Sequence, residues 1–339
     1  MSEASKSLGF MLAMFLMVNS GPSFIYAGEA EKDASPEAVA AKQLRDRLID
    51  HAFLKALSDD ARADVLTAIT KGDNASFMAA CAVLAGHPGE SHFAKEPLFA
   101  AFTTASGGRR KFAVKCLDAI SLDDARFLGE IRRLLASDKP EDRLTGVRDV
   151  AHGPRLGQRL GDEMLRTIER EPNGLVQVEM VYTVVTETPA EAADHVPVDR
   201  VATLIVRSLK TPDRKGQTVA AFCARAVHPR APETQRQALT DALMQNLTSS
   251  DGWVRLSALK NLVTMGIRPE LLHETVIASL ISDDAELRSI ALREAPQLLP
   301  GAGDLAQLVK QAIDRTGDPV IKEELMKIQY MKRSGNSHP

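Results

Sequence analysis

The chain has 339 residues, with 42 Lys and Arg against 45 Asp and Glu and a formal net charge of −3 at pH 7. This balance argues against a non-specific nucleic-acid binder, which is normally basic. Aromatic residues make up only 4% of the chain, so platforms for stacking single-stranded bases are scarce. We therefore expect no nucleic-acid partner.

The N-terminus has the features of a secretory signal peptide, which we assign to residues 1–27. Lys6 precedes an apolar run over 8–18, and Ala27 supplies a small residue before Gly28 as a cleavage context. The run is too short to span a bilayer. We expect a periplasmic or secreted protein with no stable membrane insertion after cleavage. An uncleaved anchor or a fortuitous apolar tail is the alternative.

The segment after the expected cleavage site changes from a polar stretch to a helix. Residues 28–35 are polar and are predicted to form a disordered linker. Ser35-Pro36 then begins a predicted helix over 36–57, because proline suits the first position of a helix. This helix has no counterpart in the repeats that follow, so we interpret it as an N-terminal capping helix.

A repeated pattern occupies residues 58–330. Each copy has an anchor residue with a polar residue four positions before it and apolar residues four and seven positions after it, except that the last copy has Gln329 at the seventh position. This spacing places the apolar residues on one helical stripe. The anchors are separated by 33 to 40 residues and are Phe77, Arg110, Arg143, Gln177, Gln217, Arg255, Arg288 and Lys322. The preceding polar positions, all N-cap types except Lys139, are Asp73, Ser106, Lys139, Asn173, Asp213, Asp251, Asp284 and Asp318.

Each capped helix is predicted to follow a first helix of the same pair. These first helices are expected near 60–70, 95–104, 123–136, 157–170, 198–210, 233–247, 270–281 and 304–315. Residues 331–339 are polar and are expected to form a disordered tail.

The Asp-x-x-Val-Arg-x-x-Ala-Leu pattern of 251–259, with its counterpart at 284–292, resembles the HEAT repeat family in its short forms. The resemblance implies an all-α fold, a right-handed α-solenoid of about eight HEAT-like helix pairs. It also implies that the Asp and Arg side chains tie neighbouring repeats together, which we carry over to Asp251, Arg255, Asp284 and Arg288.

No motif indicates catalysis, a metal or a cofactor. Gly-x-Ser-x-Gly, His-Glu-x-x-His and the phosphate loop are missing from the sequence. His87, His152 and His228 occupy similar turns, but two layers of a solenoid separate them by about 16–20 Å, too far to share an ion. Three cysteines, Cys81, Cys116 and Cys223, are expected to be small core residues.

One cluster of cations suggests an anion site. Arg109, Arg110 and Lys111 follow two glycines at the start of a predicted helix, where the macrodipole favours acids instead. The free backbone N–H groups of that helix start and the cations could hold a phosphate or carboxylate. A solvated basic turn is the alternative.

Two surfaces are candidates for binding a protein partner. The connections 187–199 and 228–233 are longer than the others and should emerge on one edge, which carries His152, His195 and His228. Tolerated drift in loop length is the alternative. The concave helix face offers Arg214, Lys215, Arg225 and Lys260. Trp253, the single tryptophan, either packs on a neighbouring helix or anchors a partner.

Taken together, these features predict an exported HEAT-repeat protein that acts as a protein–protein interaction scaffold without catalysis. The alternative is a HEAT-like enzyme with a dispersed active site, because such arrays also resemble bilin lyases and an alkylpurine DNA glycosylase family. Both of those enzymes are expected inside the cell, and the acidic balance counts against the DNA enzyme.

Overall fold

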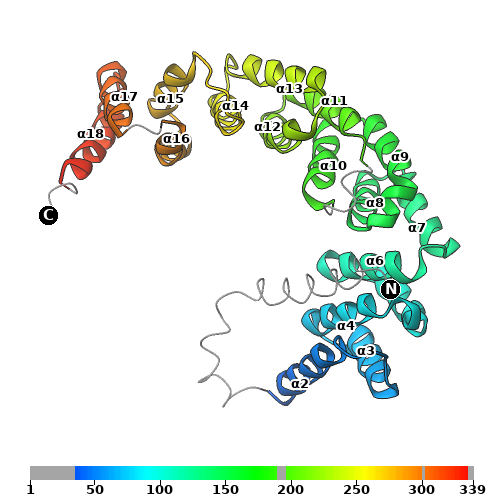
Figure 1. Ribbon diagram of the computed structural model, residues 1–339. Helices are drawn as coiled ribbons and strands as arrows, with labels where there is room; N and C mark the ends of the chain where they lie inside the picture. The colour runs from blue at the N-terminus through cyan, green and yellow to red at the C-terminus, as the bar shows by residue number, and fades with distance from the viewer. Residues whose placement is uncertain (1–34, 189–195, 300–301, 335–339) are drawn as a thin grey trace. The chain divides into compact units, whose positions relative to one another are not determined.

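The computed structural model describes residues 35–188, 196–299 and 302–334 (Figure 1). Over these residues the regular structure is helical, with 17 α-helices and no strand, so the fold is all-α. The predicted signal peptide and all of the predicted linker except Ser35 lie outside the described residues. In the described ranges, no helix combines the length and the apolar character that crossing a membrane requires.

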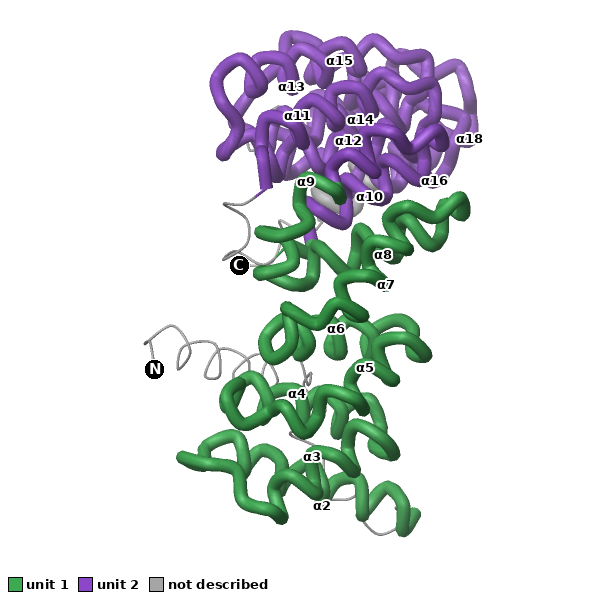
Figure 2. Tube along the Cα trace, turned by 90° about the vertical axis from the view of Figure 1, so that its right-hand side faces the viewer, with its two compact units in different colours: residues 1–164, 187–195 green, residues 165–186, 196–339 purple. Residues whose placement is uncertain are grey.

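Contacts divide the chain into two compact units, which Figure 2 colours separately. Unit 1 comprises residues 1–164 and 187–195, and unit 2 comprises residues 165–186 and 196–339. The helices that begin in unit 1 are α2 (Pro36–His51), α3 (Asp59–Lys71), α4 (Asn74–Gly86), α5 (Lys95–Thr104), α6 (Gly107–Ser121), α7 (Ala125–Leu135), α8 (Pro140–His152) and α9 (Pro154–Arg170).

The helices that begin in unit 2 are α10 (Gly174–Glu187), α11 (Val198–Leu209), α12 (Arg214–Val227), α13 (Glu233–Asn246), α14 (Gly252–Thr264), α15 (Leu272–Leu280), α16 (Ala285–Leu298), α17 (Ala302–Arg315) and α18 (Pro319–Ser334). Two short 3₁₀ segments, η3 (Pro88–Ala94) and η5 (His228–Arg230), were not predicted from the sequence.

Each unit is built from two layers of helices. In unit 1, α3 packs on α5 in one layer, while α4 packs on α6 and α6 on α8 in the other. In unit 2, α11 packs on α13 and α15 on α17, while α12 packs on α14 and α14 on α16. These helices therefore contact both a pair partner and a counterpart in the next pair, which is the contact pattern of a solenoid. The handedness and the number of repeats remain predictions.

The predicted N-caps explain where most of the second helices begin. The side chain of Asp73 accepts a hydrogen bond from the Ser76 backbone N–H at 2.7 Å, and equivalent caps are made by Asn173, Asp213, Asp251, Asp284 and Asp318. Ser106 and Lys139 make no such bond. At the first of these two starts, Gly107 has a φ of +58°, which glycine adopts without the steric cost of a side chain.

The predicted apolar stripe forms the core in all but the last two copies. Four residues after the anchors, Val114, Val147 and Leu259 are fully buried. The prediction is wrong for Met326, which is exposed while its neighbour Leu325 is buried. Leu292 is likewise only half-buried, and Ala291 takes the core position. The buried position next to the predicted one is therefore used at this point of α16 and α18.

The anchor side chains close the turn between the two helices of a pair. Nη1 of Arg255 donates to the Ser249 and Ser250 carbonyls at 2.6 and 3.0 Å, and Arg143 and Arg288 do the same with their own turns. These carbonyls stand at or just beyond helix ends, where backbone acceptors lack a helical partner. Arg255 thus acts within its own pair, which corrects the expectation that it ties neighbouring repeats together.

The other three residues that the HEAT-like resemblance singled out, Asp251, Asp284 and Arg288, do reach a neighbouring pair. Asp251 accepts from Nε of Arg214 at 2.6 Å, and Asp284 accepts from the Trp253 indole N–H at 2.7 Å. Arg288 donates to Glu324 at 3.0 Å. The half-buried Trp253 therefore joins α14 to the start of α16, as expected for a tryptophan that packs within the array.

Two helix ends differ from the predictions. The capping helix α2 ends at His51, well before residue 57, and helix α18 continues through Ser334 into the segment predicted to be a disordered tail. Residues 335–339 lie outside the described residues. The three cysteines are buried and unpaired, as expected for core residues.

Candidate functional site

The cations at the start of α6 do not converge on one position. Arg109 donates to the backbone carbonyls of Gly72 and Ile69 at 3.0 and 2.5 Å, and its guanidinium lies 4.5 Å from the centre of the Phe77 ring. Lys111 lies 2.6 Å from a carboxylate oxygen of Glu187. Because each side chain already has a partner inside unit 1, the structure does not support the predicted anion site.

Arg110, the third of these cations, is held by a buried carboxylate. Its Nη2 lies 2.6 Å from Oδ2 of Asp149 on α8, and its Nη1 donates to the Phe102 carbonyl at 2.7 Å. Its guanidinium also covers the Phe102 ring at 4.3 Å. Burial raises the pKa of Asp149 to about 6, although the contact with Arg110 acts in the opposite direction. This pair links α6 to α8 within the core of unit 1.

His152 belongs to a second charged cluster of unit 1. Its Nε2 lies 2.6 Å from the same carboxylate oxygen of Glu187 that Lys111 contacts. Burial lowers the pKa of His152 to about 4. Burial would raise the pKa of Glu187, but hydrogen bonds from Lys111 and His152 outweigh it and hold the value near 2. A neutral imidazole beside a charged carboxylate fixes the end of α8, and its Nδ1 is buried without a hydrogen-bond partner among the described atoms.

Asp118 has a capping role that the sequence analysis missed. It lies on α6, yet its carboxylate accepts from the backbone N–H groups of Arg155 and Leu156, at 3.2 and 2.7 Å, in the first turn of α9. Gly153 leaves room for it, because a Cβ there would come within 2.9 Å of the Asp118 carboxylate. When the capping residue lies on another helix, it stands at no fixed sequence distance from the helix that it caps. The repeat pattern therefore could not reveal this cap.

Three cations predicted as partner contacts in unit 2 are joined to acids. Arg214 pairs with Asp251 as described above. Lys215 lies 3.1 Å from Glu179 on α10, and Lys260 lies 2.7 Å from Glu294 on α16. These ion pairs run between second helices of neighbouring pairs, so they bridge layers of the array instead of presenting unpaired charge.

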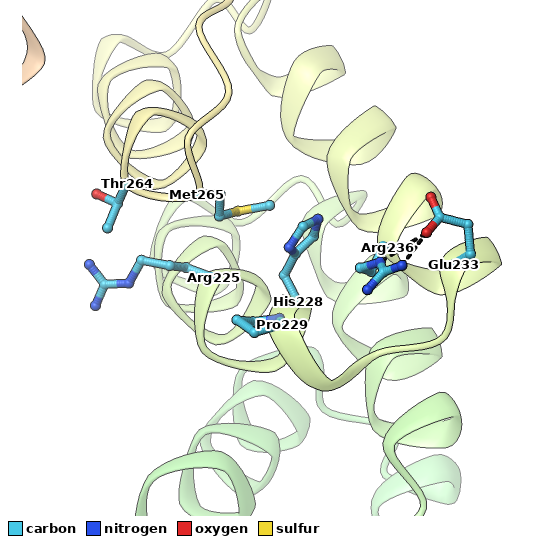
Figure 3. A pocket seen from close by; sticks show the side chains of 7 residues that line it. All are labelled: Arg225, His228, Pro229, Glu233, Arg236, Thr264 and Met265. Carbon is cyan, nitrogen blue, oxygen red and sulfur yellow. Dashed lines mark hydrogen bonds and ion pairs between the residues drawn. The ribbon is translucent and has the colours of Figure 1, made fainter.

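A pocket of about 530 Å³ lies where α12, α13 and α14 meet at their ends. It includes two residues of the predicted binding set, Arg225 and His228, and Figure 3 shows the side chains around it. Its lining residues are Arg225, His228, Pro229, Glu233, Arg236, Thr264 and Met265. Another predicted edge residue, His195, lies outside the described residues, as does most of the 187–199 connection.

The local sequence explains why three helix ends gather at this pocket. Pro229 follows His228 at the end of α12, where the chain turns through η5 before α13 begins at Glu233. Helix α14 ends in a Schellman-type turn in which Gly266 has a φ of +83° and the Ile267 N–H donates to the Leu262 carbonyl at 2.9 Å. The longer 228–233 connection thus forms one wall of the pocket.

The cations of this pocket differ in their partners. Arg236 forms an ion pair with Glu233. Burial and the nearby Arg236 lower the pKa of His228. Arg225 covers the Phe222 ring at 4.8 Å and forms no ion pair with any described residue. Among the described residues, the pocket therefore presents one guanidinium, that of Arg225, that forms no ion pair with an acid.

Two aromatic side chains extend this surface along the second helices. The rings of Phe222 on α12 and Tyr182 on α10 lie 5.8 Å apart, and Tyr182 is 42% exposed. We refer to Tyr182, Phe222, Arg225, His228 and Met265 as the aromatic surface. The sequence analysis missed its aromatic members.

The repeat alignment contains the signal that could have identified them. Tyr182 and Phe222 both stand five residues after their anchors, Gln177 and Gln217. In the other copies that position is occupied by Ala82, Lys115, Arg148, Lys260, Arg293 and Lys327. Two successive copies therefore replace a mostly cationic position with an aromatic one.

The described residues contain no group of three or more His, Cys, Asp or Glu side chains placed to hold a metal ion.

Comparison with known proteins identifies no family. No family model matches the chain, and no curated protein matches it. One solved structure, the crystal structure of an engineered protein, aligns with 96% of this chain and 95% of its own, at 18% sequence identity and a TM-score of 0.36. A similarity this weak carries no argument, so the all-α, solenoid-like assignment rests on the helices and their contacts.

Proposed function

We propose that this chain is a non-enzymatic scaffold that binds a protein partner through the aromatic surface of unit 2. The observation that carries the proposal is the continuous arrangement of Tyr182, Phe222 and Arg225, which leads into an open pocket. Tyrosine, phenylalanine, methionine and arginine are the side chains enriched in protein interfaces, and arginine and tyrosine are frequent hot spots.

The positions of these side chains suit recognition. Tyr182 and Phe222 lie on α10 and α12, whose buried faces contribute Val181 and Ala221 to the core. Side chains held on packed helices lose less conformational entropy on binding than side chains on flexible loops. The aromatic surface is therefore favoured over Arg214, Lys215 and Lys260, which would have to exchange existing ion pairs for contacts with a partner.

The proposal includes export of the protein to the periplasm or the extracellular space. It is supported by the apolar run and the Ala27 context in the sequence. Membership of the HEAT repeat family, in its short forms, is likewise a proposal, supported by the repeated Asp and Arg positions and by the two-layer packing of the helices.

Site-specific photo-crosslinking in the native host tests the binding surface. A photoreactive residue at position 182 or 222 should give a discrete crosslinked species, and purified wild-type chain should compete for it. The Tyr182→Ala/Phe222→Ala chain should compete at least about tenfold less well, which corresponds to ~1.4 kcal/mol. Position 293 is the matched control, because it is five residues after the anchor of α16 and its side chain is exposed. Equal crosslinking at 182, 222 and 293 would exclude the aromatic surface.

A further inference from the structure

We infer that the pocket end of the aromatic surface holds a carboxylate side chain of an acidic peptide segment, with Arg225 as its principal contact and His228 lining the same pocket. This inference rests on the proposed function, because it names the chemistry of the partner that the aromatic surface would bind. Figure 3 shows both side chains on the end of α12 and η5, with the guanidinium of Arg225 directed away from the His228 ring.

The first argument is a contrast in charge pairing. On the second helices of unit 2, Arg214, Lys215 and Lys260 each lie within 3.1 Å of an acid on a neighbouring helix. Arg225 lies over the Phe222 ring and has no acidic partner among the described residues. An arginine on a ring face keeps the edge of its guanidinium available for a planar, bidentate contact with a carboxylate.

The second argument is the net charge of the pocket wall. Arg236 is neutralised by Glu233, and α14 contributes only the uncharged Thr264 and Met265. Arg225 therefore leaves a formal charge of about +1 when His228 is neutral. A single positive charge matches a carboxylate, whereas sites for a phosphorylated segment typically use clusters of arginines.

The third argument concerns His228. This half-buried imidazole faces Arg236 and Glu233 from α13 and shares the pocket with Arg225. The cation and burial favour its neutral form in the empty pocket. A bound carboxylate would favour the protonated form, so binding would take up a proton. Affinity should therefore increase as the pH is lowered from 7.5 to 5.5.

The apolar part of the surface sets the second requirement on the peptide. Phe222 and Tyr182 lie on one side of Arg225, and Met265 lies inside the pocket. An acidic residue close to large apolar residues fits both features. At about 530 Å³ the pocket is large enough for a side chain of this size.

A display library of randomised twelve-residue peptides, selected against the full chain, provides the probe. We expect enriched peptides to carry Asp or Glu beside Leu, Phe or Met. In a synthetic copy of the best binder, changing the acid to its amide should weaken binding about tenfold or more. Arg225→Gln should weaken peptide binding by a similar factor. The Arg225→Gln chain and the amide peptide together should bind only slightly more weakly than when one of the two changes is made alone. Arg214→Gln, which removes an exposed cation already paired with Asp251, is the matched control and should leave affinity unchanged.

The outcomes separate this inference from the proposed function. If selected peptides need Tyr182 and Phe222 but show no acidic preference and tolerate Arg225→Gln, the carboxylate inference is refuted while the docking surface stands. If they bind the Tyr182→Ala/Phe222→Ala chain undiminished, or if no peptide is enriched, both ideas fail. Displacement of the peptide by millimolar inorganic phosphate, with a preference for phosphorylated peptides, would assign the pocket to phosphate instead. A pH dependence that persists in His228→Gln would remove His228 from the site.

Discussion

Replacing Arg110 with alanine should destabilise unit 1 far more than removing any surface cation. In the folded protein the Asp149 side chain is 3% exposed, and the guanidinium of Arg110 is its ion-pair partner at 2.6 Å. The same arginine satisfies the Phe102 carbonyl and covers the Phe102 ring. The Arg110→Ala change would leave the carboxylate buried without a counter-charge.

The expected magnitude follows from this burial. Removing one partner of a buried ion pair typically costs about 3–5 kcal/mol, because the remaining charge stays desolvated. The matched control is Lys215→Ala, whose pair with Glu179 also joins second helices of neighbouring pairs but has side chains 66% and 41% exposed. Pairs of that kind contribute about 0–1 kcal/mol. The two variants should therefore differ by roughly 2–5 kcal/mol.

Amide hydrogen exchange read by mass spectrometry is the assay, because repeat arrays often unfold in more than one step and a single unfolding free energy is then undefined. Protection in α6 and α8 should fall strongly in Arg110→Ala, and protection in α10 and α12 should barely change in Lys215→Ala. A loss below ~1 kcal/mol in α6 and α8, equal to that of the control, would refute the argument that the Asp149 charge depends on Arg110.

The pH dependence supplies an independent check. The folded-state pKa of Asp149, about 6, lies above its unfolded value of 3.8. Its protonated form therefore stabilises the fold at low pH, and this contribution is lost as the pH rises from 3.8 through 6. Without Arg110, whose contact lowers that pKa, the carboxyl should stay protonated to a higher pH. The deficit of Arg110→Ala should accordingly shrink below pH 5, and Asp149→Asn in the same chain should restore much of the lost stability at pH 7.5.

Other predictions concern a histidine, a helix cap and the N-terminus. The folded-state pKa of His152, about 4, lies below its unfolded value of 6.5, so neutral His152 should contribute on the order of 3 kcal/mol of stability that is lost as the pH falls from 6.5 to 4. The His152→Phe variant should lack this pH dependence in thermal melts between pH 6.5 and 4.5. An unchanged dependence of the melting temperature on pH would show that His152 is not its source. Asp251→Ala removes a cap on two backbone N–H groups and should lower the free energy of unfolding by about 0.5–2 kcal/mol without affecting partner affinity. A large loss of partner binding at an unaltered melting temperature would instead make Asp251 a contact residue. Intact mass of the protein from its native host should place the mature N-terminus at or near Gly28, whereas a full-length cytosolic species would contradict export.

The sequence by itself determined the helical repeat and where most of its helices begin. Aspartate at Asp73, Asp213, Asp251 and Asp284 caps the helix that follows it through a local contact, so the pattern needs no knowledge of distant residues. The apolar stripe is equally local, because it reflects the period of a single helix. The shift from Met326 to Leu325 in the core shows where this fails, because the buried face of α18 depends on the helix it packs against, α17.

Only the tertiary structure decided which charged side chains have partners. Arg110, Lys111, Arg214 and Lys260 all looked available in the sequence, yet each meets an acid from another helix pair, 34 to 76 residues away. Ion pairing depends on side-chain positions across layers, and several acids at similar spacings compete for each cation. For the same reason, the sequence could not distinguish Arg225 from its paired neighbours. The fold places Arg225 over Phe222 and beside a pocket, where it forms no ion pair with any described carboxylate.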